Sequence, residues 1–126
     1  PPIAWYLGGS VKLEAMNQQR DVDYISQHQL PICMDVCHLC MGETVFDFNA
    51  VNMIDSLLPL IEHVHIADSE GIDGEGLHFG EGDPENMTAI AKVMDINTMK
   101  VIEVWQGHLD NGAGFVKALN RLPELF

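Results

Sequence analysis

Basic residues are scarce in this chain, which has six Lys and Arg against nineteen Asp and Glu and a formal net charge of −13. An acidic surface of this kind repels the phosphates of nucleic acids and anionic membranes, so we expect neither as a partner. Long hydrophobic runs are also lacking, since the longest, 57–61, contains Pro59 and is far too short to cross a bilayer. Nothing at the N-terminus resembles a signal peptide, and we predict a cytoplasmic protein.

Cysteine is limited to Cys33, Cys37 and Cys40, which are too close in sequence for a disulfide framework between distant segments. Reduced thiols in a reducing compartment are therefore expected. Their Cys-x3-Cys-x2-Cys spacing is the one by which radical enzymes that use S-adenosylmethionine hold a four-iron cluster, so an iron–sulfur protein is one alternative. Packing of small apolar side chains is the other, and it suits Cys33, which falls inside an apolar run.

The 126 residues, 47% of them hydrophobic, are enough for one domain with a core. Three short apolar runs, at 32–36, 63–67 and 100–105, predict buried β-strands, the first of them buried on both faces. Helices are expected between and around these runs, in segments listed here: 10–27, 49–61, a helix after Asp83, and 111–122. A helix followed by three strand–helix units predicts a parallel α/β fold with right-handed crossovers.

The expected helix ends follow from capping residues and proline. Ser10 and Asp83 are the predicted N-caps, and Pro31 is expected to stop the first helix. The last helix is predicted to turn a set of apolar residues inward, namely Phe115, Val116, Leu119 and Leu122.

A glycine-rich segment, 68–83, is predicted to be a long loop that covers a substrate. Its two Gly-Glu-Gly units could cradle a phosphate, but their acidic side chains would oppose an anion. His78 within it is a candidate substrate or second-metal contact, or else a surface histidine. Trp105 could form the apolar wall of a sugar site, or could be a packed aromatic.

Four residues with metal-ligand chemistry lie at or just beyond the ends of the predicted strands: Asp35, His38, His65 and Glu103. The carboxyl ends of parallel strands meet at one rim, where α/β folds hold their active sites. Carboxylate oxygens and neutral imidazole nitrogens are ordinary ligands of divalent metals. Each residue alone has a simpler explanation, such as a capping Asp, a core or surface His, or a paired Glu. Burying a polar or charged side chain without a partner costs free energy, and three such side chains stand at equivalent strand ends. This coincidence favours a metal site.

Four motifs in this order resemble the xylose-isomerase-like TIM barrels, which include sugar isomerases, sugar epimerases and endonuclease IV. They are Asp-Val-Cys-His at 35–38, His-Val-His-Ile-Ala-Asp at 63–68, Leu-His-Phe-Gly-Glu-Gly-Asp at 77–83 and Val-Ile-Glu-Val at 101–104. The resemblance implies that residues 1–126 are a single partial domain, the C-terminal part of a (β/α)8 barrel with about three parallel strands alternating with helices. A complete barrel needs about 250 residues.

The resemblance implies a site as well as a fold. Asp35, His65 and Glu103 would bind a divalent metal (Mn, Mg, Co or Zn), and His38 beside them would bind substrate or a second metal. A fourth ligand, a Glu, would end the preceding strand at a position that falls at or just before Pro1. The N-terminal half of the barrel, or another copy of the chain, would then be needed to cover the exposed sheet.

The implied activity is isomerisation or epimerisation of a sugar or sugar phosphate through an enediolate. Glu103 and the fourth Glu would exchange the proton, with His38 as the second catalytic residue and His38, His78 and Trp105 as substrate contacts. Two positions depart from the family: endonuclease IV has an Asp at the place of Gly76, and ketose 3-epimerases have an Arg at the place of Gly71. The alternatives are a non-catalytic sugar- or metal-binding module and, with less support, an endonuclease acting at abasic sites.

Overall fold

The computed structural model describes residues 5–6, 11–12 and 18–126, so the predicted cap Ser10 lies outside the described residues. Within them the α/β class predicted from the sequence is confirmed, with five α-helices and one parallel sheet. The elements, in chain order, are β1 (Trp5–Tyr6), β2 (Val11–Lys12), α1 (Gln19–His28), β3 (Ile32–Asp35), α2 (Val36–Glu43), α3 (Ala50–Leu57), the 3-10 turn η1 (Leu58–Leu60), β4 (Ile61–Ile66), β5 (Asp68–Glu70), β6 (Gly74–Leu77), α4 (Asn86–Met94), β7 (Met99–Ile102) and α5 (Leu109–Leu125).

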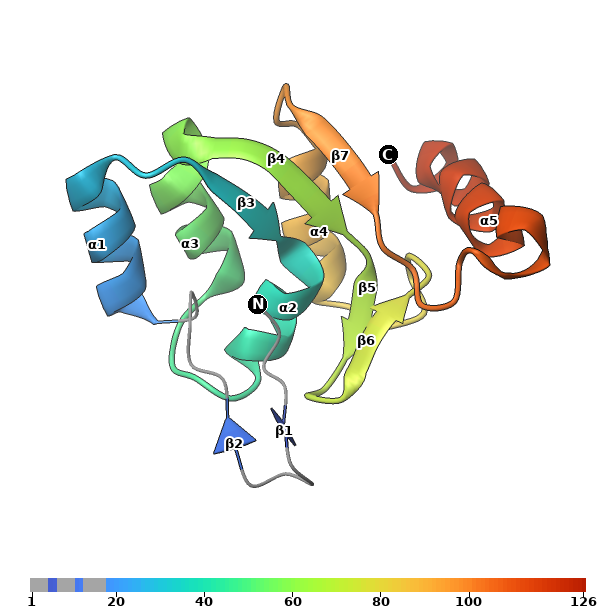
Figure 1. The fold of residues 1–126 in the computed structure, drawn as a ribbon, viewed down its shortest axis with the longest axis horizontal. Coiled ribbons are helices and arrows are strands. Elements are labelled where there is room, and N and C mark those ends of the chain that lie inside the picture. The colour runs from blue at the N-terminus through green and yellow to red at the C-terminus, as the bar shows by residue number, and fades with distance from the viewer. Residues whose placement is uncertain (1–4, 7–10, 13–17) are drawn as a thin grey trace.

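The sheet that organises the fold has three parallel strands in the order β3-β4-β7 (Figure 1). Each connection between neighbouring strands passes through at least one helix, as parallel pairing requires. This arrangement brings the carboxyl ends of the three strands to one edge. Strands β1 with β2 and β5 with β6 form two separate antiparallel pairs.

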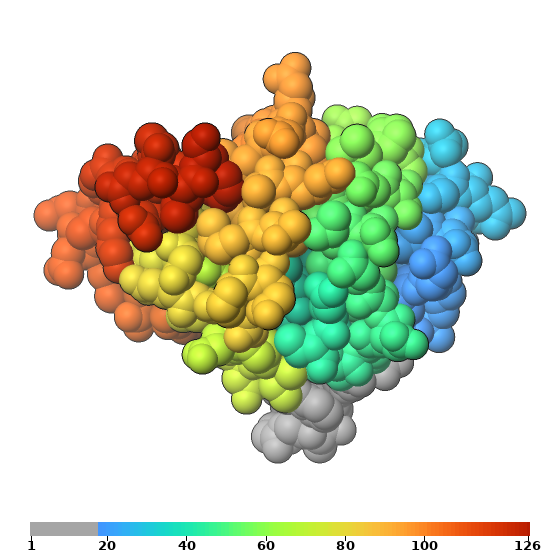
Figure 2. All heavy atoms as spheres, turned by 180° about the vertical axis from the view of Figure 1, so that it is seen from behind, coloured from blue at the N-terminus to red at the C-terminus, as the bar shows by residue number. Residues whose placement is uncertain are grey.

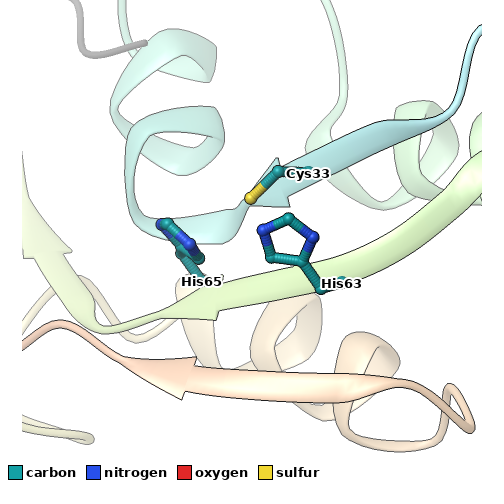
Figure 3. A group of neighbouring side chains, drawn as sticks. All are labelled: Cys33, His63 and His65. Carbon is teal, nitrogen blue, oxygen red and sulfur yellow. The ribbon is translucent and has the colours of Figure 1, made fainter.

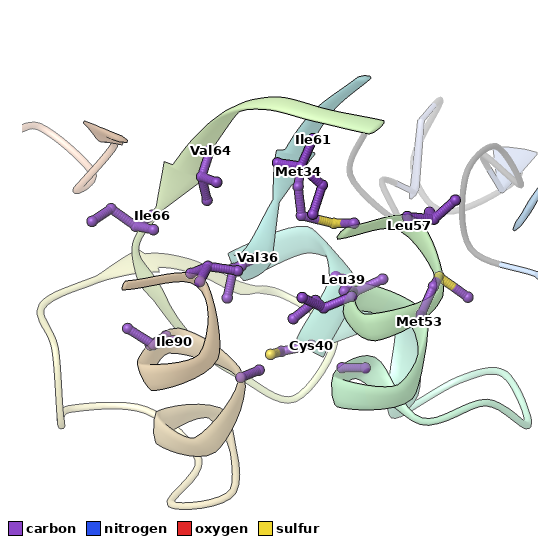
Figure 4. Close-up of a cluster of buried hydrophobic side chains, with 14 of the residues drawn as sticks. Met34, Val36, Leu39, Cys40, Met53, Leu57, Ile61, Val64, Ile66 and Ile90 are labelled. Carbon is purple, nitrogen blue, oxygen red and sulfur yellow. The ribbon is translucent and has the colours of Figure 1, made fainter. Parts of the chain in front are cut away.

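In Figure 1, α4 lies behind β4 and β7, and α3 and then α1 follow beside it toward the left; the surface seen from behind shows the same succession (Figure 2). The core lies between these helices and the sheet, where Met34, Val64 and Ile66 are buried (Figure 4). Along β3, buried and half-buried residues alternate, because successive side chains of a strand point to opposite faces. The prediction that this strand is buried on both faces is therefore wrong, and Cys33 and Asp35 lie on the other face.

The first helix starts later than predicted. It begins at Gln19, and Val11–Lys12 forms strand β2, so the prediction of a helix from Ser10 onward is wrong. Gln18 is the N-cap, and its backbone N–H donates to Oδ2 of Asp21 at 3.2 Å, which is one half of a capping box. This local pairing of polar groups sets the start of α1.

The same helix ends through its backbone conformation. Gln29 adopts a left-handed conformation with φ of 51°, and the N–H of Leu30 donates to the carbonyl of Ile25 at 3.1 Å. This is the arrangement that terminates many helices, and it stands two residues before Pro31. Pro31 therefore follows the end of α1 and does not itself cause it.

Helix α2 was not predicted, and it begins directly after β3. Asp35 is both the last residue of the strand and the N-cap of the helix, because its Oδ1 accepts a hydrogen bond from the N–H of His38 at 3.2 Å. Val36, predicted as the end of the strand, is the first residue of the helix. Capping by Asp35 stabilises this abrupt change of direction, and it fixes His38 one helical turn away from Asp35.

The segment 68–83 is partly a β-hairpin, formed by β5 and β6, so the prediction of a loop throughout is wrong. The fully buried carboxylate of Asp68 organises this segment. It accepts hydrogen bonds from the N–H groups of Gly80 (2.8 Å) and Gly82 (3.1 Å), and from the side-chain amide of Asn86 (3.1 Å). These bonds hold the end of the segment against the start of β5.

Asp83 does not cap the helix that follows it. Its Oδ2 accepts a hydrogen bond from the N–H of Gly71 at 2.8 Å, and α4 begins at Asn86 with Glu85 as the N-cap, so the predicted cap is wrong.

Helix α3 ends before the last residues of its predicted range, 49–61. The chain continues from Leu57 into the 3-10 turn η1.

The other sheet strands are shifted slightly from their predicted ranges. Strands β4 and β7 both begin before the predicted 63–67 and 100–105, and β7 ends at Ile102. Glu103 therefore follows the strand, although its N–H still donates to the carbonyl of Ile66 at 3.0 Å. This bond holds Glu103 beside the end of β4.

The last helix, α5, is interrupted by left-handed residues at 110–112, so its regular part begins after them. Phe115 and Leu122 are half-buried as predicted, but Val116 and Leu119 are 54% and 57% exposed, and the prediction that they point inward is wrong. The buried face is centred on Ala118, with Phe115 and Leu122 one turn before and after it, and Val116 and Leu119 lie at the solvent-exposed side of this face. Only one narrow face of α5 meets the core.

In the described ranges, no helix combines the length and the apolar character needed to pass through a bilayer.

Candidate metal centre

The carboxyl ends of the three parallel strands bring three predicted ligands together. Asp35 on β3 and His65 on β4 are register partners, and Glu103 follows β7, the next strand of the sheet. One ligand atom from each of the three side chains lies within 4.8 Å of the other two. Register partners on neighbouring parallel strands point to the same face, which is why residues distant in sequence converge here.

The donor chemistry of this group fits a divalent cation. Asp35 and Glu103 offer carboxylate oxygens, and His65 offers an imidazole nitrogen. Nδ1 of His65 lies 2.9 Å from Oε2 of Glu103, at a point where the Glu103 side chain is 45% exposed. Three protein ligands with access from solvent are the arrangement of catalytic metal sites, which keep a position for water or substrate.

His38 stands beside this group between two carboxylates. Its Nδ1 lies 2.5 Å from Oδ2 of Asp35, a contact whose angles are not those of a hydrogen bond, and its Nε2 lies 3.1 Å from Oε2 of Glu75. Burial alone would lower the pKa of His38, but the two carboxylates outweigh it and raise this pKa above its ordinary value of 6.5. Similarly, burial would raise the pKa of Asp35, and the contact with His38 holds it below its ordinary 3.8.

Glu75 was not singled out in the sequence, where it was only the middle residue of a Gly-Glu-Gly unit. The hairpin β5–β6 folds back so that Glu75 reaches His38, which is 37 residues away in the sequence. The Gly-Glu-Gly unit was the available sequence signal for Glu75. Glycines on both sides of an acidic residue allow its backbone to come close to another segment.

Gly76 shows why glycine is needed in this unit. Its φ is +72°, and a Cβ added to it would lie 2.8 Å from the backbone nitrogen of Trp105. The N–H of Trp105 donates to the carbonyl of Gly76 at 2.7 Å, so the two backbones are in direct contact. A side chain at this position would separate β6 from the segment after β7.

A pocket of about 280 Å³ opens beside these residues. It unites Asp35, His38, Glu103 and Trp105, all predicted from the sequence, with Glu75 of the hairpin. Trp105 is 67% exposed and forms an aromatic wall there. The remaining lining residues are Cys37, Ala67 and Gly76.

His78, the other predicted substrate contact, lies elsewhere. It lines a different pocket of about 490 Å³, together with Lys117 and Arg121 of α5. Both cations there have acidic neighbours, since Lys117 contacts Glu81 at 2.8 Å and Arg121 contacts Glu124 at 2.5 Å. The fold therefore does not bring His78 into the pocket of Asp35 and Glu103.

The three cysteines are not brought together as ligands of one cluster. Among the described residues, none of the groups able to hold a metal contains more than one of them. Cys37 and Cys40 are buried in separate apolar clusters, and burial raises the pKa of each thiol to about 12. Cys33 alone faces the side of the sheet that carries Asp35 and His65. The geometry favours packing for two of the three thiols.

The fold and this group together define an α/β protein with a candidate divalent-metal centre at the carboxyl edge of a parallel sheet. Comparison with protein-family models, with curated proteins and with solved structures finds no match to the chain.

Proposed function

We propose that this chain is the C-terminal part of a (β/α)8 barrel of a metal-dependent sugar isomerase or epimerase, resembling the xylose-isomerase-like TIM barrels. The observation that carries the proposal is the convergence of Asp35, His65 and Glu103 at the carboxyl ends of three adjacent parallel strands. In barrels of this kind the active site lies at that end. A pocket large enough for a small polar molecule adjoins the group.

In this proposal Asp35, His65 and Glu103 hold a divalent ion such as Mn, Mg, Co or Zn. The bound ion would supply electrophilic stabilisation of the negative charge that develops when a proton leaves the carbon next to a carbonyl, in an enediolate. The carboxylate of Glu103 borders the pocket. Glu103 and a second carboxylate would remove the proton from this carbon and return it. Trp105 would pack against the apolar face of the sugar ring or chain.

His38 would orient the substrate. Its ring is held by Asp35 on one side, and its Nε2 points at the half-exposed carboxylate of Glu75 at the pocket. A substrate hydroxyl could replace that carboxylate as the hydrogen-bond partner of Nε2. The raised pKa of His38 favours the protonated ring, in which Nε2 carries a proton that it can donate.

The proposal requires further strands. In the described residues the parallel sheet has three strands, and its outer strands β3 and β7 each pair on one side only. Met99 on β7 and Trp105 beyond it are 65% and 67% exposed. We propose that the N-terminal half of the barrel, or a second copy of this chain, covers this sheet and supplies a fourth carboxylate ligand.

The test is solvent exchange in the assembled protein. The Mn²⁺-loaded protein is incubated in D2O with aldoses, ketoses and their phosphates, and NMR follows deuterium incorporation next to the carbonyl. We expect incorporation with one class of sugar and its loss in Glu103→Gln, with Asp73→Asn as the exposed-carboxylate control. Unchanged exchange in Glu103→Gln would contradict the catalytic role. Stoichiometric metal without exchange would favour the non-catalytic sugar- or metal-binding module.

A further inference from the structure

A second group of ligands lies on the same face of the sheet, one step further from its carboxyl edge. It consists of Cys33 on β3 with His63 and His65 on β4 (Figure 3). One ligand atom from each of the three side chains lies within 4.8 Å of the other two. The backbone explains this, because Cys33 and His63 are register partners and His65 is two positions further along the same strand.

The environment of Cys33 distinguishes it from the other two thiols. Cys37 and Cys40 belong to buried apolar clusters, whereas Cys33 is half-buried and belongs to neither cluster. Its neighbours on the sheet face are polar: the rings of His63 and His65, whose centroids are 5.3 Å apart, and the carboxylate of Asp35. Apolar packing accounts for Cys40, and the buried Sγ of Cys37 is hydrogen-bonded to the backbone of Asp68 and Gly76, whereas the thiol of Cys33 lies among side chains that can bind a metal.

The donor set has a definite metal preference. One thiolate and two imidazoles are the ligands of Zn²⁺ and of the similar ions Co²⁺ and Cd²⁺, whereas Mg²⁺ and Mn²⁺ prefer oxygen. Three protein ligands leave the fourth tetrahedral position to water. The group of Asp35, His65 and Glu103 offers mostly oxygen. The two groups therefore differ in the ions that they favour.

We propose that Cys33, His63 and His65 form a second metal site, selective for Zn²⁺ and other thiolate-binding ions, that competes with the Asp35, His65 and Glu103 site. His65 belongs to both groups. A neutral imidazole has one nitrogen with a free lone pair, so His65 ligates one ion at a time. When zinc binds to Cys33, His63 and His65, His65 is no longer available to the Asp35, His65 and Glu103 site. Binding of Mg²⁺ or Mn²⁺ at that site is then lost. This inference extends the proposed function but does not depend on turnover.

The first test is spectroscopic and uses the full chain. Co²⁺ is titrated into the protein, and thiolate ligation is recorded as sulfur-to-cobalt charge-transfer absorption in the near ultraviolet. We expect this absorption in the wild-type protein and its loss in Cys33→Ser. Cys40→Ala is the matched control, because it removes a thiol that lies in the core and should leave the absorption unchanged. Absence of the band from the wild-type protein, or its survival in Cys33→Ser, would overturn the proposal.

A second measurement needs no variant and so does not depend on how a substitution folds. Alkylation of Cys33 by iodoacetamide is followed by peptide mass spectrometry with and without Zn²⁺. A thiolate whose lone pair is bound to zinc is a poorer nucleophile than a free thiolate, and we expect the rate of alkylation of Cys33 to fall about tenfold or more at saturating Zn²⁺. An unchanged rate at saturating Zn²⁺ would also refute the site.

Competition separates this proposal from the proposed function. The EPR signal of free Mn²⁺ is followed while Zn²⁺ is added to the Mn²⁺-loaded protein. We expect one Zn²⁺ to release one Mn²⁺ in the wild-type protein, and at a lower Zn²⁺ concentration than in Cys33→Ser, where Zn²⁺ acts only by direct exchange at the Asp35, His65 and Glu103 site. In Asp35→Asn, Mn²⁺ binding should be lost while the sulfur-to-cobalt band remains. If Asp35→Asn binds Mn²⁺ normally, the proposed function fails and the second site stands. If the band is absent while Mn²⁺ binding requires Asp35, the second site fails alone.

Discussion

The side chains of Asp35 and His65 stand side by side because the two residues are register partners on the neighbouring parallel strands β3 and β4. No loop is needed to place either of them. The backbone hydrogen bonds of the sheet hold the two candidate ligands at a spacing that a metal ion can bridge, so the candidate site rests on regular backbone structure. Asp35 also caps helix α2, and its carboxylate therefore has a structural and a proposed chemical role.

Replacement of Asp35 by Asn separates these two roles. Asn is as good an N-cap as Asp, so α2 and the thermal midpoint should change little. The amide is a much weaker metal ligand than a carboxylate, and we expect Mn²⁺ affinity to fall by about a hundredfold. Isothermal titration calorimetry measures the affinity, and Asp73→Asn, which alters an exposed carboxylate, is the control. Equal affinity in both variants would show that Asp35 is not a ligand.

The ionisation of His38 should depend on Glu75. Nε2 of His38 lies 3.1 Å from the Glu75 carboxylate, which helps to raise the pKa of the ring. In Glu75→Gln the charge is lost while the shape is kept, so the pKa of His38 should fall toward 6.5. NMR titration of the ring protons in metal-free protein measures it. A pKa that does not move would mean that Glu75 contacts His38 too weakly to matter.

The pair of Asp35 and His38 should also make stability depend on pH in metal-free protein. The raised pKa of His38 stabilises the fold below pH 6.5, and this contribution is lost as the pH rises through the folded value. The lowered pKa of Asp35 stabilises the fold above pH 3.8, and this contribution is lost as the pH falls through the folded value. The contribution of the pair is therefore greatest between these limits. Urea midpoints measured from below pH 3.8 to above pH 6.5 should show a flatter profile in His38→Gln than in the wild-type protein.

Cys37 and Cys40 should be unreactive in the folded protein. With a pKa of about 12, only about one thiol in ten thousand is ionised at pH 8, and both side chains are buried. We expect no alkylation of either by iodoacetamide at pH 8 over an hour and complete reaction in urea, as counted by intact mass. Labelling of the folded chain at the rate of a free thiol would contradict the burial of these residues.

Asp68 should contribute strongly to the stability of the fold. Its buried carboxylate accepts hydrogen bonds from Gly80, Gly82 and Asn86. In Asp68→Asn the side-chain NH2 group would replace one acceptor oxygen and would face the N–H donors of these residues. We expect the free energy of unfolding to fall by about 3 kcal/mol. Chemical denaturation measures this loss, and Asp73→Asn in the same segment should change stability by less than about 0.5 kcal/mol. Similar values for the two variants would contradict the organising role of Asp68.

The sequence predicted the parts of the site that depend on strand order. Asp35, His65 and Glu103 each follow an apolar run, and the carboxyl ends of parallel strands meet at one edge whatever the details of the connections. Helix α2 was missed because an apolar run ending in Asp is equally a strand end and a helix cap. The exposed positions of Val116 and Leu119 were missed because an apolar residue on a helix does not by itself tell which face meets the core.

The sequence by itself determined the parallel α/β class, and it placed residues of the types that can bind a metal at the ends of three strands, because periodicity and residue type are local properties of the chain. The tertiary structure alone decided that Glu75 reaches His38 and that His78 lies in another pocket. It also placed Cys33 beside His63. These relationships depend on hairpin formation, on strand register and on the close approach of backbones at Gly76, which arise only when segments distant in the sequence pack together.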